Sequence, residues 1–337
     1  METAVNDPIL KVRNLRLTIP LGAGSLNAVR GIDFDLQRGE TLCIVGESGS
    51  GKSLTALSII DLLGRGIERR ADRLEFDGID LLKAGRSQMR SLRGDRMAMI
   101  FQEPMTSLNP AYTIGDQLVE AFRLHRKADR AAARARAVEL LEKVGITAAA
   151  SRLGQYPHQL SGGLRQRVMI AMALMCEPEL IIADEPTTAL DVTIQAQILH
   201  LLAELTREMG VAMILITHDL GVVARVADKV AVMYAGELVE TGTAKKVFEA
   251  PVHPYTRGLL GCIPVPGRTQ RGAPLGAIPG IVPSLISEVS GCAFRSRCAE
   301  ATEACGAFIP HRVASEGSHS FRCVHESGRK AGAEAGT

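Results

Sequence analysis

Three short runs in the chain are apolar throughout, except for a Thr at the start of the first. They are "TLCIV" at 41–45, "LIIA" at 180–183 and "VAMILI" at 211–216. A half-buried strand would alternate polar and apolar residues, so these runs predict strands buried on both faces of a mainly parallel sheet. Two of them end in ionisable residues, within "DEP" and "THD". Because ligands bind at the carboxyl ends of strands in open α/β sheets, these positions are candidate site residues.

Helical patterns separate the predicted strands. "SLTALSIIDLL" at 53–63 and "LRQRVMIAMALM" at 164–175 each predict a helix. "KADRAAARARAVELLEKVGI" at 127–146 predicts an amphipathic helix with a mixed charged face. We therefore expect an α/β fold with a helical subdomain, about residues 86–175, inserted between segments of the sheet.

The composition changes near residue 250. The chain has 337 residues and 46% hydrophobic content, enough for one large domain and an appendage. After residue 250, Pro and Gly become frequent and five of the seven cysteines follow. We expect a main domain over 9–250, a C-terminal segment over 251–325, and a disordered tail over 326–337.

Charge and composition exclude several classes of protein. The formal net charge is +2, aromatic residues make up 4% and Trp is absent, which argues against a nucleic-acid-binding protein. No apolar run approaches the roughly 20 residues of a membrane helix, and the first residues do not resemble a signal peptide. We expect a protein of the cytosol, or one held at a membrane only through partners. Seven cysteines then favour metal or cluster ligation over disulfides.

"GESGSGKS" at 46–53 follows a predicted strand and opens a predicted helix. In such a P-loop, glycines allow backbone N–H groups to surround phosphate oxygens, and the helix N-terminus faces the same charge. Lys52 is expected to reach the β- and γ-phosphates, and Ser53 to ligate Mg²⁺. A chance glycine-rich turn is disfavoured by the strand–loop–helix context. The predicted nucleotide-contacting residues are Gly46, Glu47, Ser48, Gly49, Ser50, Gly51, Lys52, Ser53 and Leu54.

Four polar residues complete the predicted site. Asp184 suits Mg²⁺, which prefers oxygen ligands, and Glu185 is the candidate for polarising an attacking water. Alone, this acidic pair would more often be a solvated turn, His218 a structural histidine, and Gln102 an ordinary loop residue. Because a P-loop is present in the same chain, a role for the acidic pair in the site is favoured over a solvated turn.

"LSGGLRQR" at 160–167 makes these pieces one pattern. P-loop, Gln loop, LSGG signature, Asp-Glu pair, "ALD" and "THD" follow one another in the order of ABC-transporter ATPase subunits, which the chain resembles from residue 9 to about 325. The resemblance implies a P-loop NTPase fold of the ABC ATPase type. That fold has a mixed core sheet, an antiparallel β subdomain and an inserted helical subdomain, here with a small Cys-rich C-terminal module.

The resemblance also implies roles. Two subunits are expected to face each other head to tail, so that Ser161, Gly162 and Gly163 contact the ATP on the partner's P-loop. Asp191 would link the two sites. Mg²⁺ would be held by Ser53, Gln102 and Asp184. The implied catalytic residues are Glu185, His218 and Gln102.

Further segments resemble the dipeptide/oligopeptide/nickel importer branch, and its D-type ATPase subunit in particular. They are "FQEPMTSLNP" at 101–110, "YPHQLSGGLRQRVMIAMAL" at 156–174, "HPYTRGLL" at 253–260 and "GCAFRSRC" at 291–298. The resemblance implies a non-identical F-type ATPase partner, two membrane permease subunits and an extracytoplasmic solute-binding protein. It places the chain at the cytoplasmic face of the inner membrane and predicts di- or oligopeptide import. Nickel, glutathione or another small solute are alternatives, as is a non-transport ABC ATPase.

One feature departs from the ABC pattern. These ATPases usually stack an aromatic residue on the adenine from a loop before the P-loop, yet residues 1–33 contain no Phe, Tyr or Trp. Ile19 stands near the expected place and is predicted to cover the base instead.

The cysteines of the C-terminal segment are widely spaced. Cys292, Cys298, Cys305 and Cys323 are separated by 5, 6 and 17 residues. Zinc sites usually bring pairs two to four residues apart, so spacing alone leaves a cluster, zinc and free buried cysteines open. The peptide-importer branch has members with a [4Fe–4S] cluster here, and the resemblance therefore favours a structural cluster, with zinc as the alternative. Together with ATP and Mg²⁺, it completes the predicted cofactors.

Overall fold

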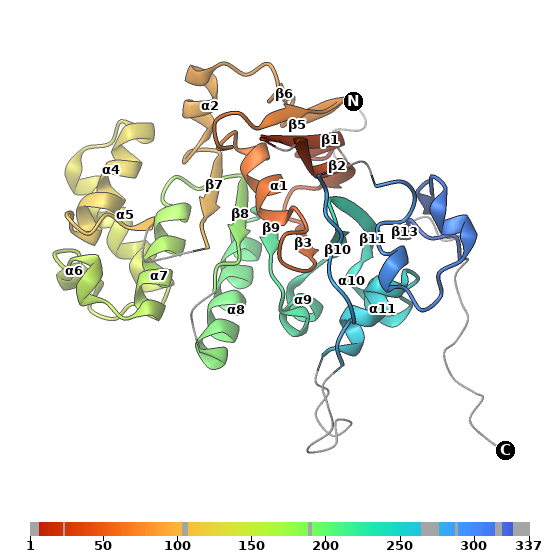
Figure 1. The fold of residues 1–337 in the computed structure, drawn as a ribbon. Coiled ribbons are helices and arrows are strands. Elements are labelled where there is room, and N and C mark those ends of the chain that lie inside the picture. The colour runs from red at the N-terminus through yellow and green to blue at the C-terminus, as the bar shows by residue number, and fades with distance from the viewer. Residues whose placement is uncertain are drawn as a thin grey trace, which may run out of the picture.

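A mixed sheet of eight strands forms the centre of the molecule (Figure 1). The computed structural model describes residues 7–22, 24–102, 107–187, 191–263, 276–286, 289–313 and 319–325. The strands of this sheet are β3 (Thr41–Val45), β7 (Met97–Ile100), β8 (Leu180–Asp184), β9 (Ala212–Ile216), β10 (Lys229–Tyr234), β11 (Glu237–Thr243), β12 (Arg312–Val313) and β13 (His319–Phe321). Their order is β12-β13-β11-β10-β3-β9-β8-β7, and the strands from β10 to β7 pair in parallel.

The three apolar runs of the sequence are the strands β3, β8 and β9. Every residue of these strands is buried, which confirms the prediction from their unbroken apolar pattern. They are neighbours in the order β3-β9-β8 and run parallel. Their carboxyl ends therefore lie at one edge of the sheet, where the P-loop, "DEP" and "THD" begin.

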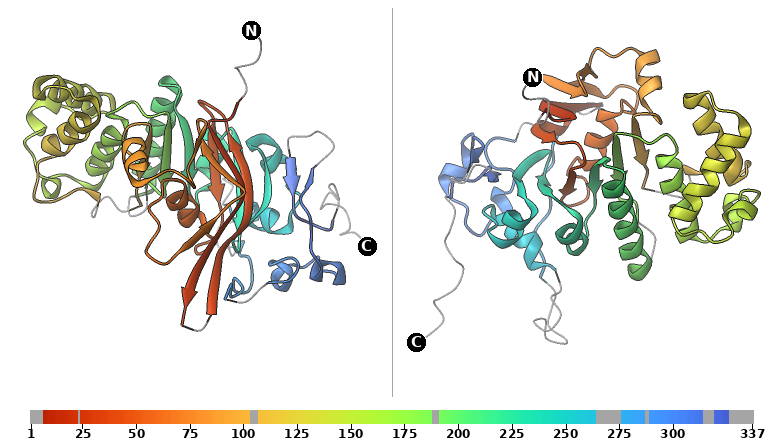
Figure 2. Two further views of the ribbon diagram at one scale, coloured as in Figure 1. Left: turned by 90° about the horizontal axis from the view of Figure 1, so that it is seen from above. Right: turned by 180° about the vertical axis from the view of Figure 1, so that it is seen from behind.

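A second, antiparallel sheet covers this core. Its strands are β1 (Leu10–Leu21), β2 (Gly24–Leu36), β4 (Glu68–Arg70), β5 (Arg73–Phe76) and β6 (Ile79–Asp80). Figure 2 shows β1 and β2 as the long hairpin that the sequence alone did not delimit. Apolar side chains of β1 and β2 pack against β3, β9 and β10 in one buried cluster.

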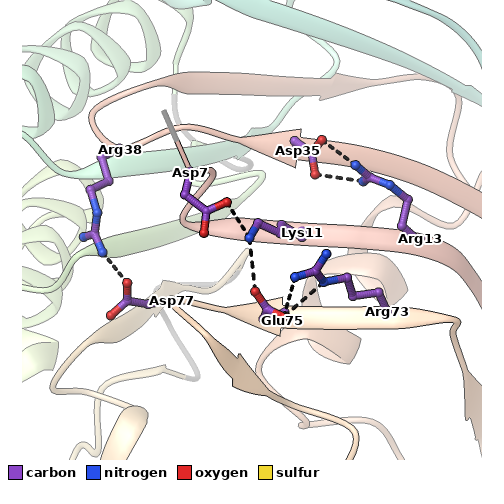
Figure 3. Close-up of polar contacts among 8 residues, drawn as sticks. All are labelled: Asp7, Lys11, Arg13, Asp35, Arg38, Arg73, Glu75 and Asp77. Carbon is purple, nitrogen blue, oxygen red and sulfur yellow. Dashed lines mark hydrogen bonds and ion pairs between the residues drawn. The ribbon is translucent and has the colours of Figure 1, made fainter. Parts of the chain in front are cut away.

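Cross-strand ion pairs join the strands of the antiparallel sheet (Figure 3). Lys11 and Glu75 face each other in the β1–β5 register with an Nζ–Oε1 distance of 3.2 Å. Arg13 donates two hydrogen bonds to Asp35, of 2.8 and 2.6 Å. Cross-strand pairs of this kind contribute about 0.2–1 kcal/mol each, so the buried apolar face supplies most of the stability of the sheet.

The helices lie mainly beside the parallel strands. Their bounds are α1 (Lys52–Ile59), α2 (Arg86–Leu92), α4 (Ile114–Arg126), α5 (Arg130–Lys143), α6 (Ala149–Arg152), α7 (Gly162–Leu174), α8 (Val192–Glu208), α9 (Leu220–Val226), α10 (Ala244–Glu249) and α11 (Pro254–Gly261), with 3₁₀ turns η1 (Pro157–Gln159), η2 (Arg295–Arg297) and η3 (Glu303–Gly306). Side chains of Thr113, Asp129 and Ser161 cap α4, α5 and α7 by accepting a backbone N–H. These three helices and α6 form an arm at one end of the molecule (Figure 1). None of the described helices has the length and apolar character needed to cross a bilayer.

The C-terminal segment returns to the core sheet at its other end. β13 pairs with β11, so residues 319–321 extend the same sheet as the P-loop strand. Beneath this junction lies the carboxylate of Glu240, whose residue exposure is 0%. It accepts hydrogen bonds from the N–H groups of Val252 and His253, both 2.8 Å long, and lies 2.6 Å from His319 Nε2. The predicted tail, residues 326–337, lies outside the described residues.

We predict that Glu240→Gln lowers the free energy of unfolding by about 3 kcal/mol. The variant keeps the shape of the side chain, but its amide has one acceptor oxygen and places an NH₂ group among buried donors. Urea denaturation of the full chain measures the loss, with exposed Glu249→Gln as the matched control. A loss no larger than that of the control would show that Glu240 does not anchor the C-terminal segment.

Candidate functional site

The loop between β3 and α1 requires glycine at two positions. Gly46 has φ +153°, and a Cβ there would lie 2.0 Å from the carbonyl oxygen of Met233. Gly51 has φ +105°, and its Cβ would lie 2.6 Å from the oxygen of Ala28. Both glycines therefore allow the loop to pass close to neighbouring backbone, as the sequence pattern predicted.

Lys52 folds back over this loop. Its Nζ donates to the carbonyl oxygens of Gly46 and Glu47 at 2.8 and 2.9 Å, and the residue is only 5% exposed. Burial lowers the pKa of Lys52, and the nearby carboxylates of Glu185, Asp184 and Glu47 act against that shift. Nζ of Lys52 is therefore a buried hydrogen-bond donor beside the loop. Phosphate oxygens bound in the loop would accept charge-assisted hydrogen bonds from it.

Ser53, at the start of α1, lies in contact with Asp184, at the end of β8. Ser53 Oγ donates to Asp184 Oδ1 at 2.9 Å. Burial raises the pKa of Asp184, while the hydrogen bond from Ser53 opposes the change. A hydroxyl and a carboxylate in contact are oxygen ligands of the kind that Mg²⁺ prefers, so the pair fits its predicted role.

Gln102, Glu185 and His218 converge beyond the ends of β7, β8 and β9. Gln102 Nε2 donates to Glu185 Oε2 at 3.4 Å, and His218 Nδ1 lies 3.7 Å from the same oxygen. Glu185 has φ +43°, a conformation rarely adopted by a non-glycine residue, and its N–H donates to the oxygen of Ile216 at 2.9 Å. The three side chains that the sequence named as catalytic therefore share one side of the cleft.

One cleft of about 480 Å³ connects these groups. Its walls are Leu26, Ala28, Gly46, Glu47, Ser48, Gly49, Gly51, Lys52, Ser53, Leu54, Gln102, Glu185, His218 and Leu285. Ser50 and Asp184 lie behind this surface, with exposures of 1% and 5%. The predicted nucleotide residues of the P-loop are thus brought to one site.

The apolar end of the cleft differs from the prediction. Its walls include Leu26 and Ala28 of β2 and Leu285 of the C-terminal segment. The oxygen of Leu285 accepts the N–H of Asn27 at 3.0 Å, which fixes the segment against β2. Ile19 pairs with Leu26 across the β1–β2 ladder and is not among the described residues that form the cleft, so its predicted contact with a base is not supported. No sequence signal marked Leu285, because it follows the P-loop by more than 200 residues.

Ser161, Gly162 and Gly163 lie away from this cleft. Ser161 caps α7 through its Oγ, which accepts the N–H of Leu164 at 3.4 Å, and Ser161 and Gly162 are exposed. A Cβ at Gly163 would lie 3.1 Å from the side chain of Ile194 in α8. Asp191 is the N-cap of the same helix. The signature and Asp191 are therefore near each other and do not contribute to the chain's own P-loop cleft.

The four C-terminal cysteines line one small cavity. Cys292, Cys298, Cys305 and Cys323 surround it together with residues that include His253 and Phe294. The N–H of Cys292 donates to the oxygen of Cys305 at 2.9 Å. Burial raises the pKa of the Cys292 thiol to about 11 and also raises the pKa of Cys298 and Cys323. Cys305 and Cys323 are buried, and Cys292 and Cys298 are half-buried. A positive centre in this cavity would favour the thiolate forms of Cys292, Cys298 and Cys323.

The arrangement does not by itself demonstrate a metal site. Across the described ranges, no three His, Cys, Asp or Glu side chains are grouped so that they could hold a metal ion. The ligand geometry therefore does not support the predicted [4Fe–4S] cluster at the cysteines, nor its alternative, zinc. The sequence did select the four cysteines that share a cavity.

Comparisons with known proteins agree with the interpretation of the cleft as a nucleotide site. Residues 29–188 match the ABC transporter family, and residues 239–305 match the C-terminal region of oligopeptide/dipeptide transporters. Among solved structures, the dimeric post-hydrolysis state of the ATP-binding cassette MJ0796 bound to ADP and Pi matches with a TM-score of 0.63. That match has 28% identity and covers 70% of this chain and 98% of that one.

Curated relatives match nearly the whole chain. The dipeptide transport ATP-binding protein DppD of Bacillus subtilis is 51% identical over 94% of both chains. DppD of Escherichia coli is 49% identical over 90% of this chain and 92% of its own. The oligopeptide transport ATP-binding protein OppD of Salmonella typhimurium is 48% identical over 93% of this chain and 96% of its own. This chain belongs to the family of ATP-binding proteins of dipeptide and oligopeptide ABC transporters.

Proposed function

We propose that the chain is the ATP-hydrolysing subunit of an importer that takes up dipeptides or oligopeptides through separate permease subunits. The observation that carries this proposal is the meeting of Lys52, Ser53 and Asp184 with Gln102, Glu185 and His218 around one cleft. The names of the similar peptide-transport proteins support peptides over nickel as the solute, and they do not favour a non-transport ATPase.

In the proposed reaction, backbone N–H groups of residues 46–53 and Nζ of Lys52 bind the phosphates of ATP. Ser53, Asp184 and Gln102 would hold Mg²⁺, which neutralises charge on the phosphate oxygens. Glu185 accepts a proton from the attacking water, and His218 contacts the γ-phosphate. Leu26, Ala28 and Leu285 offer an apolar surface to the base, in place of an aromatic ring. The position of each group along the cleft supports these proposed roles.

The partner's ATP would be completed by Ser161, Gly162 and Gly163. These residues open α7, a helix of 13 residues, so their N–H groups and the positive end of the helix dipole face solvent and are available to a γ-phosphate. Asp191, close by at the start of α8, would transmit the state of one site to the other. The dimeric form of the similar cassette MJ0796 agrees with this proposal.

The proposal includes the expected partners. They are a non-identical F-type ATPase subunit, two permease subunits and an extracytoplasmic solute-binding protein, with the chain peripheral to the cytoplasmic face of the inner membrane. The family match to the C-terminal region of peptide transporters supports this assembly. We also propose 9–250 as the ATPase domain, with helices over about 86–175, and 251–325 as the C-terminal module.

We further propose a [4Fe–4S] cluster at Cys292, Cys298, Cys305 and Cys323. Support comes from the donor set, since four cysteines without disulfide partners line one cavity. Such a cluster would supply positive charge and covalent cross-links between distant parts of the segment. The thiolates of this chain would hold η2 and η3 together.

Glu185→Gln is predicted to lower ATP turnover by about 100-fold or more while ATP binding remains. The amide keeps the size of the side chain but cannot accept the proton of the attacking water. Turnover and nucleotide affinity are measured on the complex that co-purifies with the chain. Native turnover in the variant would remove Glu185 from the catalytic role.

Ser161→Arg in the Glu185→Gln background is predicted to abolish the ATP-dependent association of the two ATPase subunits. The added side chain occupies the helix N-terminus that faces the partner, whereas the chain's own cleft is intact. Analytical ultracentrifugation with Mg·ATP measures association, and a filter assay measures ATP bound by the isolated chain. Loss of ATP binding with association preserved would contradict the trans arrangement.

Anaerobic purification tests the cluster. We predict iron and sulfide in the stoichiometry of a [4Fe–4S] cluster, with visible absorbance that Cys298→Ser removes. Cys262 lies outside the cavity and Cys262→Ser is the matched control. Absence of iron from the anaerobic native chain would refute this part of the proposal.

A further inference from the structure

Arg297 of the C-terminal segment reaches the P-loop. Its side chain is only 4% exposed, and its Nη1 lies 2.9 Å from Oε2 of Glu47. The two residues are 250 positions apart in the chain. Glu47 is the second residue of "GESGSGKS" and forms part of the wall of the nucleotide cleft. The C-terminal segment therefore places a cation directly behind the phosphate-binding loop.

The guanidinium of Arg297 is held in place by other contacts. Nε donates to the oxygen of Pro279 at 2.8 Å, and Nη2 donates to the oxygen of Ile278 at 3.1 Å. The group also lies 5.7 Å from the ring centre of Tyr234 and 5.8 Å from that of Phe294. These contacts fix the guanidinium before a nucleotide binds, so its orientation toward Glu47 does not depend on the ligand.

A second residue of the segment holds the backbone of Glu47. The hydroxyl oxygen of Tyr255 accepts the N–H of Glu47 at 2.9 Å, and Tyr255 is fully buried. Tyr255 and Arg297 thus fix the main chain and the side chain of one P-loop residue. No comparable long-range side-chain contact is recorded for Ser48 or Gly49 in the described structure, so the entry to the loop is the part that the C-terminal segment holds.

The charge of Glu47 explains why a cation is needed there. Glu47 lies close enough to Lys52 to influence its ionisation. Without Arg297, the carboxylate of Glu47 would repel the phosphates of a nucleotide and compete with them for Lys52. Its second oxygen, Oε1, is buried and has no hydrogen-bond partner among the described residues, so Arg297 supplies the charge compensation at this carboxylate.

We propose that Arg297 is a positioning residue for nucleotide binding, which neutralises Glu47 and orders the start of the P-loop from the C-terminal segment. The inference rests on the proposed ATPase function and extends it. It makes the C-terminal segment part of the nucleotide site. The segment also carries Cys292 and Cys298 on either side of η2, so the cysteine cavity and the P-loop are joined through one short turn.

The test is a double-variant comparison on the full chain. Arg297→Gln is expected to raise the Kd for Mg·ATP, measured by displacement of trinitrophenyl-ATP, at least about five-fold. Adding Glu47→Gln removes the uncompensated carboxylate, so the double variant should recover an affinity within about two-fold of Glu47→Gln alone. Arg295→Gln, an exposed arginine on the same turn, is the matched control and should leave the Kd unchanged.

Rescue separates charge compensation from a purely structural role. If Arg297 served only to fold the segment, Glu47→Gln would not restore binding, and that result would overturn the inference. An unchanged Kd in Arg297→Gln would overturn it as well. Should Arg297→Gln fail to fold, Glu47→Gln alone decides, because it must bind Mg·ATP at least as tightly as the native chain. A native chain that does not bind Mg·ATP at all would instead refute the proposed function.

Discussion

The buried ammonium group of Lys52 is the constraint around which the nucleotide site is built. Lys52 is only 5% exposed, so its ammonium group needs acceptors, and the loop supplies two carbonyl oxygens by curving around it. That curve brings Gly46 and Gly51 against neighbouring backbone, where a side chain would not fit. Carboxylates at the ends of β8 complete the surroundings of the cation. The site thus gathers a fixed positive charge, loop N–H groups and oxygen ligands at one sheet edge.

The sequence predicted the parts of this site that local patterns specify. Unbroken apolar runs identified β3, β8 and β9, and the residues that follow each run identified Lys52, Asp184, Glu185 and His218. Parallel pairing then explains why they meet, because strands distant in the chain end at one edge. The helix after the signature was also predicted from its local pattern, whereas the roles of Gln102 and of the signature residues came from the family resemblance.

Contacts across long stretches of chain could not be predicted in the same way. Leu285 forms the apolar end of the cleft and Arg297 pairs with Glu47, yet neither lies in a periodic segment or a motif. Ile19 was expected at the base because it stands near the place where the family usually has an aromatic residue, but it is Leu26, its partner in the β1–β2 register, that forms part of the cleft wall. Spacing could not show whether the cysteines converge either. Tertiary packing decides all of these positions.

The C-terminal segment is structurally continuous with the ATPase core. β13 extends the core sheet, Glu240 anchors residues 252–253 beneath it, and Tyr255 and Leu285 belong to the same buried apolar cluster as Val45 of the P-loop strand. The composition of the sequence set this segment apart from the main domain, yet the segment contributes to both ends of the nucleotide cleft. Because of this continuity, the segment that contains the cysteine cavity is packed directly against the P-loop.

Nucleotide binding by Lys52→Ala tests the central claim most directly. Titration of Mg·ATP into the folded variant is predicted to show a Kd at least about ten-fold above that of the native chain, because the charge-assisted hydrogen bonds to phosphate are lost. Lys83→Ala, at a side chain that is 86% exposed, should bind as the native chain does. If Lys52→Ala bound Mg·ATP with native affinity, the cleft at the end of β3 would not be the phosphate-binding site.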